Sequence, residues 1–414
     1  MNHAPPQHYG PRTVRRRTVF YVAGFDPRGP AWYHGTYRRN AARQAELTGM
    51  GISVSDRQKL GGEVTAWTVD AETAGMKTHT DYVFLRWDDI VRCYWPRGTL
   101  TLWRVMWRNL REYTTSGVLW RLFKTSWPTF ICAFYPSAFV LALAALSLLI
   151  GAALGITLSS LAGWPSWAVW PIAITACLAG TAVGTPLLDR WFSIHWLTRI
   201  YAFNRLQARR QAPDLDERLD EFARLIATTA RDGGSDEILI VGHSTGAQAA
   251  VALLGRTLEI DPDLGRHGPR LSFMTLGSSI SMLSWQPEAE WFRSALKRVA
   301  CEPDLDWIDF TIAQDGACFA LHDPVESAGL AHPPGAEPKP KLLSVRLFDL
   351  FTPEEFGKIR RNWYQVHFQY LMATQRAGDY DYFAITAGPH TLADRFAHRD
   401  TTRNFDRFKL KIFG

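Results

Sequence analysis

One long segment without ionisable side chains limits the folds available to this chain more than any other feature. No Asp, Glu, Lys, Arg or His occurs from Thr125 to Leu188. The polar turn at 159–166 divides the segment, and we expect one membrane-spanning helix near residues 131–157 and another near 167–187. Each reaches the roughly 20 apolar residues that cross a bilayer. A buried hairpin in a soluble core is the alternative, but apolar residues at a helix centre each favour insertion by about 0.3–0.6 kcal/mol and no charge opposes them.

Positive charge flanks this hairpin and is missing between its two spans. The cationic residues are Arg97, Arg104, Arg108, Arg111, Arg121 and Lys124 before it, and Arg190, Arg199, Arg205, Arg209 and Arg210 after it. Cytoplasmic loops of membrane proteins carry an excess of Lys and Arg. We therefore expect both ends to be cytoplasmic, in an inner (cytoplasmic) membrane that the chain crosses twice.

Each expected span also carries two glycines four residues apart. They are Gly151 and Gly155 in the first span and Gly180 and Gly184 in the second. Glycines at this spacing let helix backbones approach closely. Either the two spans pack against each other, or they join two copies of the chain in a homodimer.

A basic amphipathic helix is expected just before the hairpin. Apolar residues recur at helical spacing, with arginines on another face: Leu100, Trp103, Trp107 and Leu110 against Arg104, Arg108 and Arg111. Such a helix lies on an anionic leaflet or on the surface of a soluble domain. Either placement accounts for the local positive charge, so the formal net charge of +6 does not indicate nucleic acid as a partner.

Outside the hairpin, short apolar runs alternate with helical stretches. The expected strands are Thr18–Ala23, 64–70, 82–87, Glu237–Val241, Leu271–Leu276, Trp307–Ala313 and Leu342–Phe348, and the expected helices lie at about 38–49, 214–231 and 353–374. This alternation predicts an α/β fold with a mostly parallel sheet and helices on both faces. We expect one split domain, 1–124 and 189–414, around the hairpin at 125–188.

The pentapeptide Gly242-His243-Ser244-Thr245-Gly246 lies between one of these strands and a helix of small residues. A serine hydroxyl is a poor nucleophile at neutral pH, and a sharp strand-to-helix turn helps by projecting it toward a base. Glycines at 242 and 246 meet the steric need of so tight a turn. The pattern predicts a nucleophile elbow; an ordinary Gly/Ser turn is the alternative.

The elbow and the α/β alternation together resemble the α/β-hydrolase superfamily, particularly its lipase-like serine hydrolases. The resemblance covers roughly residues 18–124 and 189–390. The hairpin lies outside the family pattern, because it enters before the elbow strand, whereas the usual cap follows the strand after the elbow helix. Lid behaviour is therefore not implied.

This resemblance implies a catalytic triad in the chain order serine, acid, histidine. Ser244 would be the nucleophile. Asp315, directly after the strand at 307–313, is the first choice for the acid, with Asp323 of an Asp-Pro-Val phrase as the alternative. His367 follows the last predicted strand and is the first choice for the base, with His390 as the alternative. His243 is expected to point away from the serine hydroxyl, in a packing or supporting role.

The resemblance also implies two backbone donors for an oxyanion. One is the N–H of Thr245, and the other would come from the loop Gly24–Gly29, where the N–H of Phe25 is the expected donor. The fuller His-Gly phrase that many members of the superfamily carry in this loop is absent.

Several other classes of site receive no support from the sequence. There is no metal-ligand spacing, P-loop or dinucleotide fingerprint, so we expect neither a metal nor a cofactor. The cysteines Cys93, Cys132, Cys177, Cys301 and Cys318 contain no C-x-x-C pair and fit a reducing compartment. The first residues lack an apolar stretch followed by a cleavage site, so no secretory signal is expected.

These features predict a membrane-anchored serine hydrolase whose active site faces the cytoplasm. It would cleave a carboxylic ester or thioester through an acyl-enzyme. A lipid-like substrate is favoured because such molecules partition into the bilayer beside the enzyme. A catalytically inactive membrane-tethered scaffold with the same fold is the alternative from another functional class.

Overall fold

The computed structural model describes residues 13–410, so the N-terminal stretch considered for a secretory signal lies outside the described residues. The chain forms two compact units. One, here called the sheet unit, comprises residues 13–93 together with Gln207–Arg407. The other, the helical unit, comprises Tyr94–Leu206 and residues 408–410. The helical unit thus extends on both sides of the hairpin expected at 125–188.

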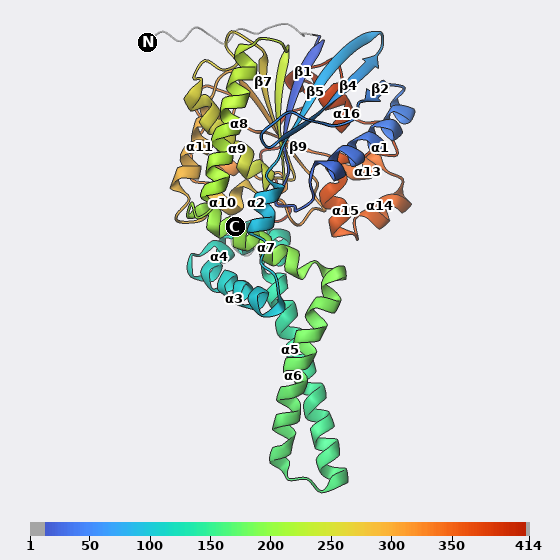
Figure 1. Ribbon diagram of the computed structural model, residues 1–414, viewed down its shortest axis with the longest axis vertical. Helices are drawn as coiled ribbons and strands as arrows, with labels where there is room; N and C mark the ends of the chain where they lie inside the picture. The colour runs from blue at the N-terminus through green and yellow to red at the C-terminus, as the bar shows by residue number, and fades with distance from the viewer. Residues whose placement is uncertain (1–12, 411–414) are drawn as a thin grey trace. The chain divides into compact units, whose positions relative to one another are not determined.

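A nine-stranded sheet forms the centre of the sheet unit (Figure 1). Its strands are β1 (Arg16–Val22), β2 (Gly51–Val54), β3 (Gln58–Lys59), β4 (Val64–Thr73), β5 (Met76–Leu85), β6 (Glu237–His243), β7 (Arg270–Leu276), β8 (Leu305–Thr311) and β9 (Lys341–Ser344). They lie in the order β2-β4-β5-β1-β6-β7-β8-β9, and β3 pairs with β4. Neighbours from β5 to β9 are parallel, whereas β2, β3 and β4 add an antiparallel edge. The predicted α/β class with a mostly parallel sheet is confirmed.

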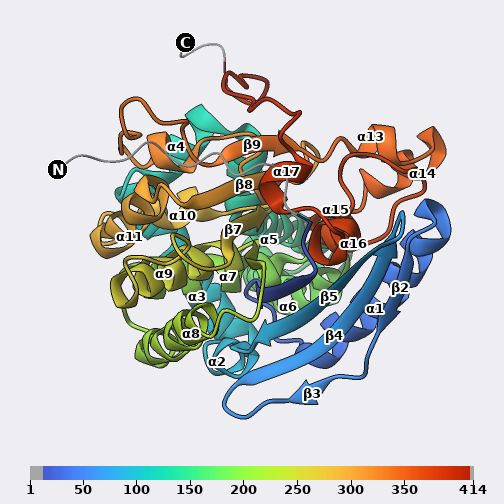
Figure 2. The same cartoon turned by 90° about the horizontal axis from the view of Figure 1, so that it is seen from above.

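Helices cover both faces of this sheet, as Figure 2 shows. On one face lie α8 (Pro213–Arg231), α9 (Gly246–Ile260) and α11 (Glu290–Cys301), and on the other lie α1 (Pro30–Thr48) and α16 (Tyr382–Ala387). Shorter helices connect them: α2 (Asp88–Cys93), α10 (Ile280–Ser284), α12 (Pro324–Ser327), α13 (Leu347–Leu350), α14 (Pro353–Ile359), α15 (Trp363–Phe368), η2 (Gln369–Leu371) and α17 (Leu392–Arg395). Every residue of β6 is buried, as expected for a central strand covered on both faces.

Several boundaries in the sheet unit differ from those predicted. Helix α1 begins at Pro30 rather than near residue 38, because proline at the first helical position suits a helix start. Strand β9 ends at Ser344, since Arg346 adopts a positive φ of 55° and begins a helical turn. The helix expected at 353–374 is divided, because the side chain of Asn362 accepts a hydrogen bond from the Gln365 amide and starts a new helix.

The helical unit contains the two long apolar helices that the sequence predicts. Its elements are α3 (Thr99–Thr115), α4 (Val118–Thr125), α5 (Trp127–Ala162), η1 (Ser166–Ala168), α6 (Val169–Phe192) and α7 (Ile194–Ala208). Two helical segments, Trp127–Ala162 and Ser166–Phe192, are long and apolar enough to cross a membrane. Only 17% of the most apolar window of each is buried, whereas a core helix of a soluble protein would be mostly covered.

The glycines of both small-residue motifs lie where α5 and α6 pack against each other. A Cβ atom added at Gly151 would lie 2.5 Å from the Cβ of Ala176. One added at Gly155 would lie 2.9 Å from the Cα of Val169, and one added at Gly180 would overlap Ser147. The close backbone approach that these motifs permit is therefore made within the hairpin.

Helix α3 buries part of its predicted apolar stripe, because Trp103 packs against a cluster that includes Met106, and Leu110 lines a cavity. Its buried residues are Leu102, Met106, Asn109 and Tyr113. Leu100 and Trp107 of the predicted stripe are 57% and 41% exposed instead. Arg104, Arg108 and Arg111 are exposed as well. One face of α3 therefore presents both tryptophan and arginine to its surroundings.

Candidate functional site

The turn between β6 and α9 has the backbone geometry of a tight elbow. Ser244 has a φ of 59°, in the left-handed region that residues other than glycine rarely adopt. A Cβ atom added at Gly242 would lie 2.7 Å from the Cα of Ala247. One added at Gly246 would overlap the carbonyl oxygen of Val22. The turn therefore admits only glycine at these two positions.

The elbow lies at the carboxyl edge of the parallel strands. Gly242 is in register with Val22 at the end of β1, and His243 is in register with Leu276 at the end of β7. Leu276 is in turn paired with Phe310 of β8. The loops that follow β1, β7 and β8 consequently surround the elbow, which is the usual place for a binding site in an open α/β sheet.

Asp315 and His367 meet in this region although they come from separate loops. Nδ1 of His367 is 2.9 Å from Oδ2 of Asp315, and each side chain is 2% exposed. Asp315 also accepts hydrogen bonds from the Ala317 amide at 3.0 Å and the Tyr370 hydroxyl at 3.1 Å. Burial alone would raise the pKa of Asp315, but His367 and the Ala317 amide hold it below its usual value. The carboxylate is therefore ionised at neutral pH.

The two alternative residues lie elsewhere in the sheet unit. The side chain of Asp323 caps α12 and lies 2.8 Å from Nε2 of His332. His390 is exposed, and its carbonyl oxygen accepts a hydrogen bond from the guanidinium of Arg17, near the start of β1. The structure thus pairs Asp315 with His367 and pairs neither alternative with them. Tyr370, which holds Asp315, was not singled out in the sequence.

Backbone contacts connect Ser244 with the Asp315–His367 pair. The Ser244 amide donates to the carbonyl of Leu276 at 2.8 Å. The next residue, Gly277, has a φ of 53°, and a Cβ atom added there would lie 3.1 Å from Oδ2 of Asp315. Ser244 is 7% exposed, and among the described residues no hydrogen bond joins its hydroxyl to another group.

His243 links the elbow to the segment that carries His367. Its Nε2 lies 2.8 Å from the carbonyl oxygen of His367, and because a carbonyl only accepts, the imidazole donates. The two rings are 5.0 Å apart. Burial, followed by the proximity of His367, lowers the pKa of His243 to about 3, so this ring is neutral at ordinary pH.

The loop after β1 lies directly over the elbow. The Phe25 amide, the expected oxyanion donor, donates instead to the Thr245 hydroxyl at 2.6 Å. A Cβ atom added at Gly24 would lie 3.1 Å from the Cβ of Ser244 and 3.4 Å from Oγ1 of Thr245. Trp87 fixes the start of this loop through a 2.9 Å hydrogen bond from Nε1 to the carbonyl of Ala23.

Arg28 connects the same loop to α15. Its guanidinium pairs with the carboxylate of Asp26 through Nε at 2.9 Å. The guanidinium carbon also lies 3.6 Å from the ring centroid of Trp32 and 4.6 Å from that of Phe368, the neighbour of His367. These cation–π contacts hold the loop and the histidine segment together.

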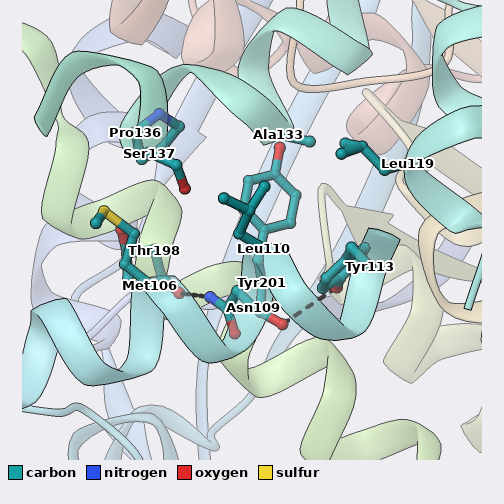
Figure 3. Close-up of a pocket in the computed structure, with 10 residues that line it drawn as sticks. All are labelled: Met106, Asn109, Leu110, Tyr113, Leu119, Ala133, Pro136, Ser137, Thr198 and Tyr201. Atoms are coloured by element: carbon teal, nitrogen blue, oxygen red, sulfur yellow. Dashed lines mark hydrogen bonds between the residues drawn. The ribbon is translucent and has the colours of Figure 1, made fainter. Parts of the chain in front are cut away.

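Cavities and one cluster of possible metal ligands also lie outside this region. A cavity of about 20 Å³ among α3, α4, α5 and α7 has room for about one water molecule (Figure 3). A cavity of about 420 Å³ adjoins the end of β9, and its charged side chains include the pairs Arg346–Asp349 and Arg399–Asp379. Asp323, Glu326 and His332 bring possible ligand atoms within 4.8 Å of one another, which the sequence spacing had not suggested.

Comparison of the chain with protein-family models, with curated proteins and with solved structures found no match. The resemblance to the α/β hydrolases therefore stays an expectation. The α/β architecture and the two membrane-length helices, in contrast, are features of the structure itself.

Proposed function

We propose that the protein is a membrane-anchored serine hydrolase of the α/β-hydrolase type that cleaves a carboxylic ester or thioester through an acyl-enzyme. One observation carries the proposal. A buried, hydrogen-bonded Asp315–His367 pair lies against an elbow whose serine adopts a φ of 59°. Strained backbone of this kind persists where function requires it, and an acid that orients a histidine close to the serine of a tight strand-to-helix turn is the arrangement of a catalytic triad.

In the first step Ser244 attacks the carbonyl carbon of the substrate, and its proton passes to Nε2 of His367. Asp315 holds Nδ1 of the same ring, which selects the tautomer whose Nε2 accepts a proton. The carbonyl electron pair moves to oxygen and forms an oxyanion. When this oxyanion collapses, the bond to the leaving group breaks and His367 returns the proton to the leaving oxygen or sulfur. Water then repeats the sequence and releases the acid.

The contact between Ser244 and His367 is part of the proposal, because the hydroxyl has no hydrogen bond among the described residues. Catalytic hydrogen bonds are often long or poorly aligned without substrate and tighten when it binds. The same observation favours the second candidate, a membrane-tethered scaffold without turnover. The two candidates therefore differ in whether bound substrate brings these groups together.

The two long apolar helices support a substrate drawn from the membrane. Both are long and apolar enough to cross a bilayer, and the same chain carries the elbow with Ser244. A lipid-like ester is the proposed substrate class, because such molecules partition into the membrane that these helices would cross.

The flanking charges support a cytoplasmic catalytic domain. Arginines gather at both ends of the hairpin and none lies between its spans. The exposed face of α3, with Trp107 beside Arg104 and Arg108, suits the interface of an anionic leaflet. We therefore place the sheet unit on the cytoplasmic side of the inner membrane.

A panel of acyl esters of graded chain length tests the proposed function with the purified full-length protein. The wild type should hydrolyse at least one ester, and Ser244→Ala should abolish the activity. Ser235→Ala is the matched control, since this serine precedes the same strand but bonds to Thr18. A folded wild type without turnover on any ester or thioester would support the scaffold instead.

A further inference from the structure

The hydrogen bond between Phe25 and Thr245 bears on which groups hold the oxyanion, a question that rests on the proposed function. A backbone N–H has a single hydrogen to donate. That of Phe25 is directed to Oγ1 of Thr245 at 2.6 Å, and the donor residue is only 2% exposed. The amide expected to receive the oxyanion is thus already bonded in the substrate-free protein.

The bond leaves the proton of the Thr245 hydroxyl available. A hydroxyl has one donor hydrogen and two acceptor lone pairs. Because Oγ1 accepts from Phe25, its own hydrogen points away from that amide. Thr245 is the N-cap residue of α9, yet its side chain makes no capping hydrogen bond with the helix. The hydroxyl is therefore not occupied by the task that a threonine at a helix start usually performs.

The hydroxyl also lies close to the reacting serine. The Cβ of Ser244 and Oγ1 of Thr245 lie 3.1 Å and 3.4 Å from one point, the Cβ position above Gly24. The carbonyl oxygen of His243 lies 3.2 Å from the same point, so a side chain at residue 24 would be crowded by all three groups. Gly24 thus lets the loop after β1 approach both the serine and this hydroxyl closely.

We propose that the Thr245 hydroxyl, and not the Phe25 amide, is the second oxyanion donor, and that Phe25 acts by orienting and polarising this hydroxyl. Oxyanion stabilisation requires donors that are fixed before the charge develops, and the bond from Phe25 fixes a hydroxyl that would otherwise rotate. As Ser244 forms its bond to the carbonyl carbon, the electron pair on oxygen accepts hydrogen bonds from the N–H and O–H of Thr245. No proton leaves Thr245, and the carbonyl reforms when the leaving group departs.

Three variants of residue 245 test the proposal on an ester that the wild type hydrolyses. Thr245→Val keeps the shape of the side chain without the hydroxyl, and we expect kcat to fall about 100- to 1,000-fold with little change in KM. Thr245→Ser restores the hydroxyl and should recover most of kcat. If the Thr245 hydroxyl merely blocks Phe25, the valine variant frees that amide and kcat stays level or rises, which would overturn the proposal.

Two further measurements keep the test decisive. Covalent labelling of Ser244 by a fluorophosphonate in every variant shows that the elbow remains folded. If the valine variant does not fold, Thr245→Cys and Thr245→Ala replace it, and kcat must decline from serine to cysteine to alanine. A wild type without labelling or turnover contradicts the proposed function itself, whereas an active wild type with an equally active valine variant contradicts only the role of the hydroxyl.

Discussion

Glu237→Gln should destabilise the sheet unit strongly, because it removes one charge from a fully buried ion pair. The side chains of Arg17 and Glu237 are both 0% exposed, and Nε lies 2.6 Å from Oε2. Glu237 also accepts hydrogen bonds from Ser272 at 2.6 Å and from the Leu392 amide at 2.8 Å. Every hydrogen bond of this carboxylate comes from a donor. The NH2 group of a glutamine at this position would therefore face one of these donors and lose that hydrogen bond.

The expected loss follows from these contacts. Breaking a buried ion pair by removing one partner costs about 3–5 kcal/mol, because the other charge stays buried without compensation. Without the Glu237 carboxylate, Arg17 keeps only neutral acceptors, among them the carbonyls of Gly388 and His390 at 2.8 Å and 2.6 Å. We therefore expect the free energy of unfolding to fall by about 3–5 kcal/mol, a large part of the usual stability of a domain.

Urea unfolding of the full-length protein in detergent, followed by tryptophan fluorescence, measures this loss. Asp56→Asn is the matched control, because it removes one charge from the surface pair Arg38–Asp56, whose side chains are 59% and 93% exposed. The control should unfold at nearly the wild-type urea concentration. An equally small shift for Glu237→Gln would refute the reasoning that the buried charges depend on each other.

Three further variants test the fold and the site. Burial raises the pKa of Asp309 to about 7, so the wild type loses stability as the pH rises toward that value. The loss is about 1.4 kcal/mol per pH unit below the pKa. In urea unfolding between pH 5 and pH 8, the free energy of unfolding of Asp309→Asn should therefore rise by up to about 3 kcal/mol relative to that of the wild type. Gly246→Ala places a methyl group against the carbonyl of Val22 and should lose about 1–3 kcal/mol or fail to fold, which thermal melting detects. Tyr370→Phe removes the hydroxyl that donates to Asp315 at 3.1 Å and accepts from the Ile312 amide at 2.9 Å. The free energy of unfolding in urea should fall by about 1–3 kcal/mol, and kcat should fall as well. An unchanged kcat would contradict a positioning role for Tyr370.

The local features of the fold were predictable from the sequence because they depend on neighbouring residues. The residues that determine the strand before the elbow and the small-residue helix after it lie within a few positions of Ser244 in the sequence. The two membrane-length helices follow from one uncharged segment. Strands β2 and β3 were missed because they are short, Gly51–Val54 having four residues and Gln58–Lys59 two.

The long-range features of the site were harder to predict. Asp315 and His367 were proposed from the chain order of a family, and no local pattern shows that their side chains meet. The role of Tyr370 depends on the path of the chain after β9, which sequence spacing does not contain. The bond from Phe25 to Thr245 likewise arises only when the end of β1 packs against the elbow. The helix at α3 was predicted, but its buried face depends on the surrounding helices.

The most direct test of the proposed hydrolase is the site of covalent reaction with a fluorophosphonate, determined by peptide mass spectrometry on the full-length membrane protein. A single stoichiometric adduct on Ser244 is predicted, because only a serine activated by His367 should attack the phosphorus centre rapidly. His367→Ala should slow the labelling, and Ser244→Ala should prevent it. A folded wild type that stays unlabelled, or an adduct on another serine, would contradict the account.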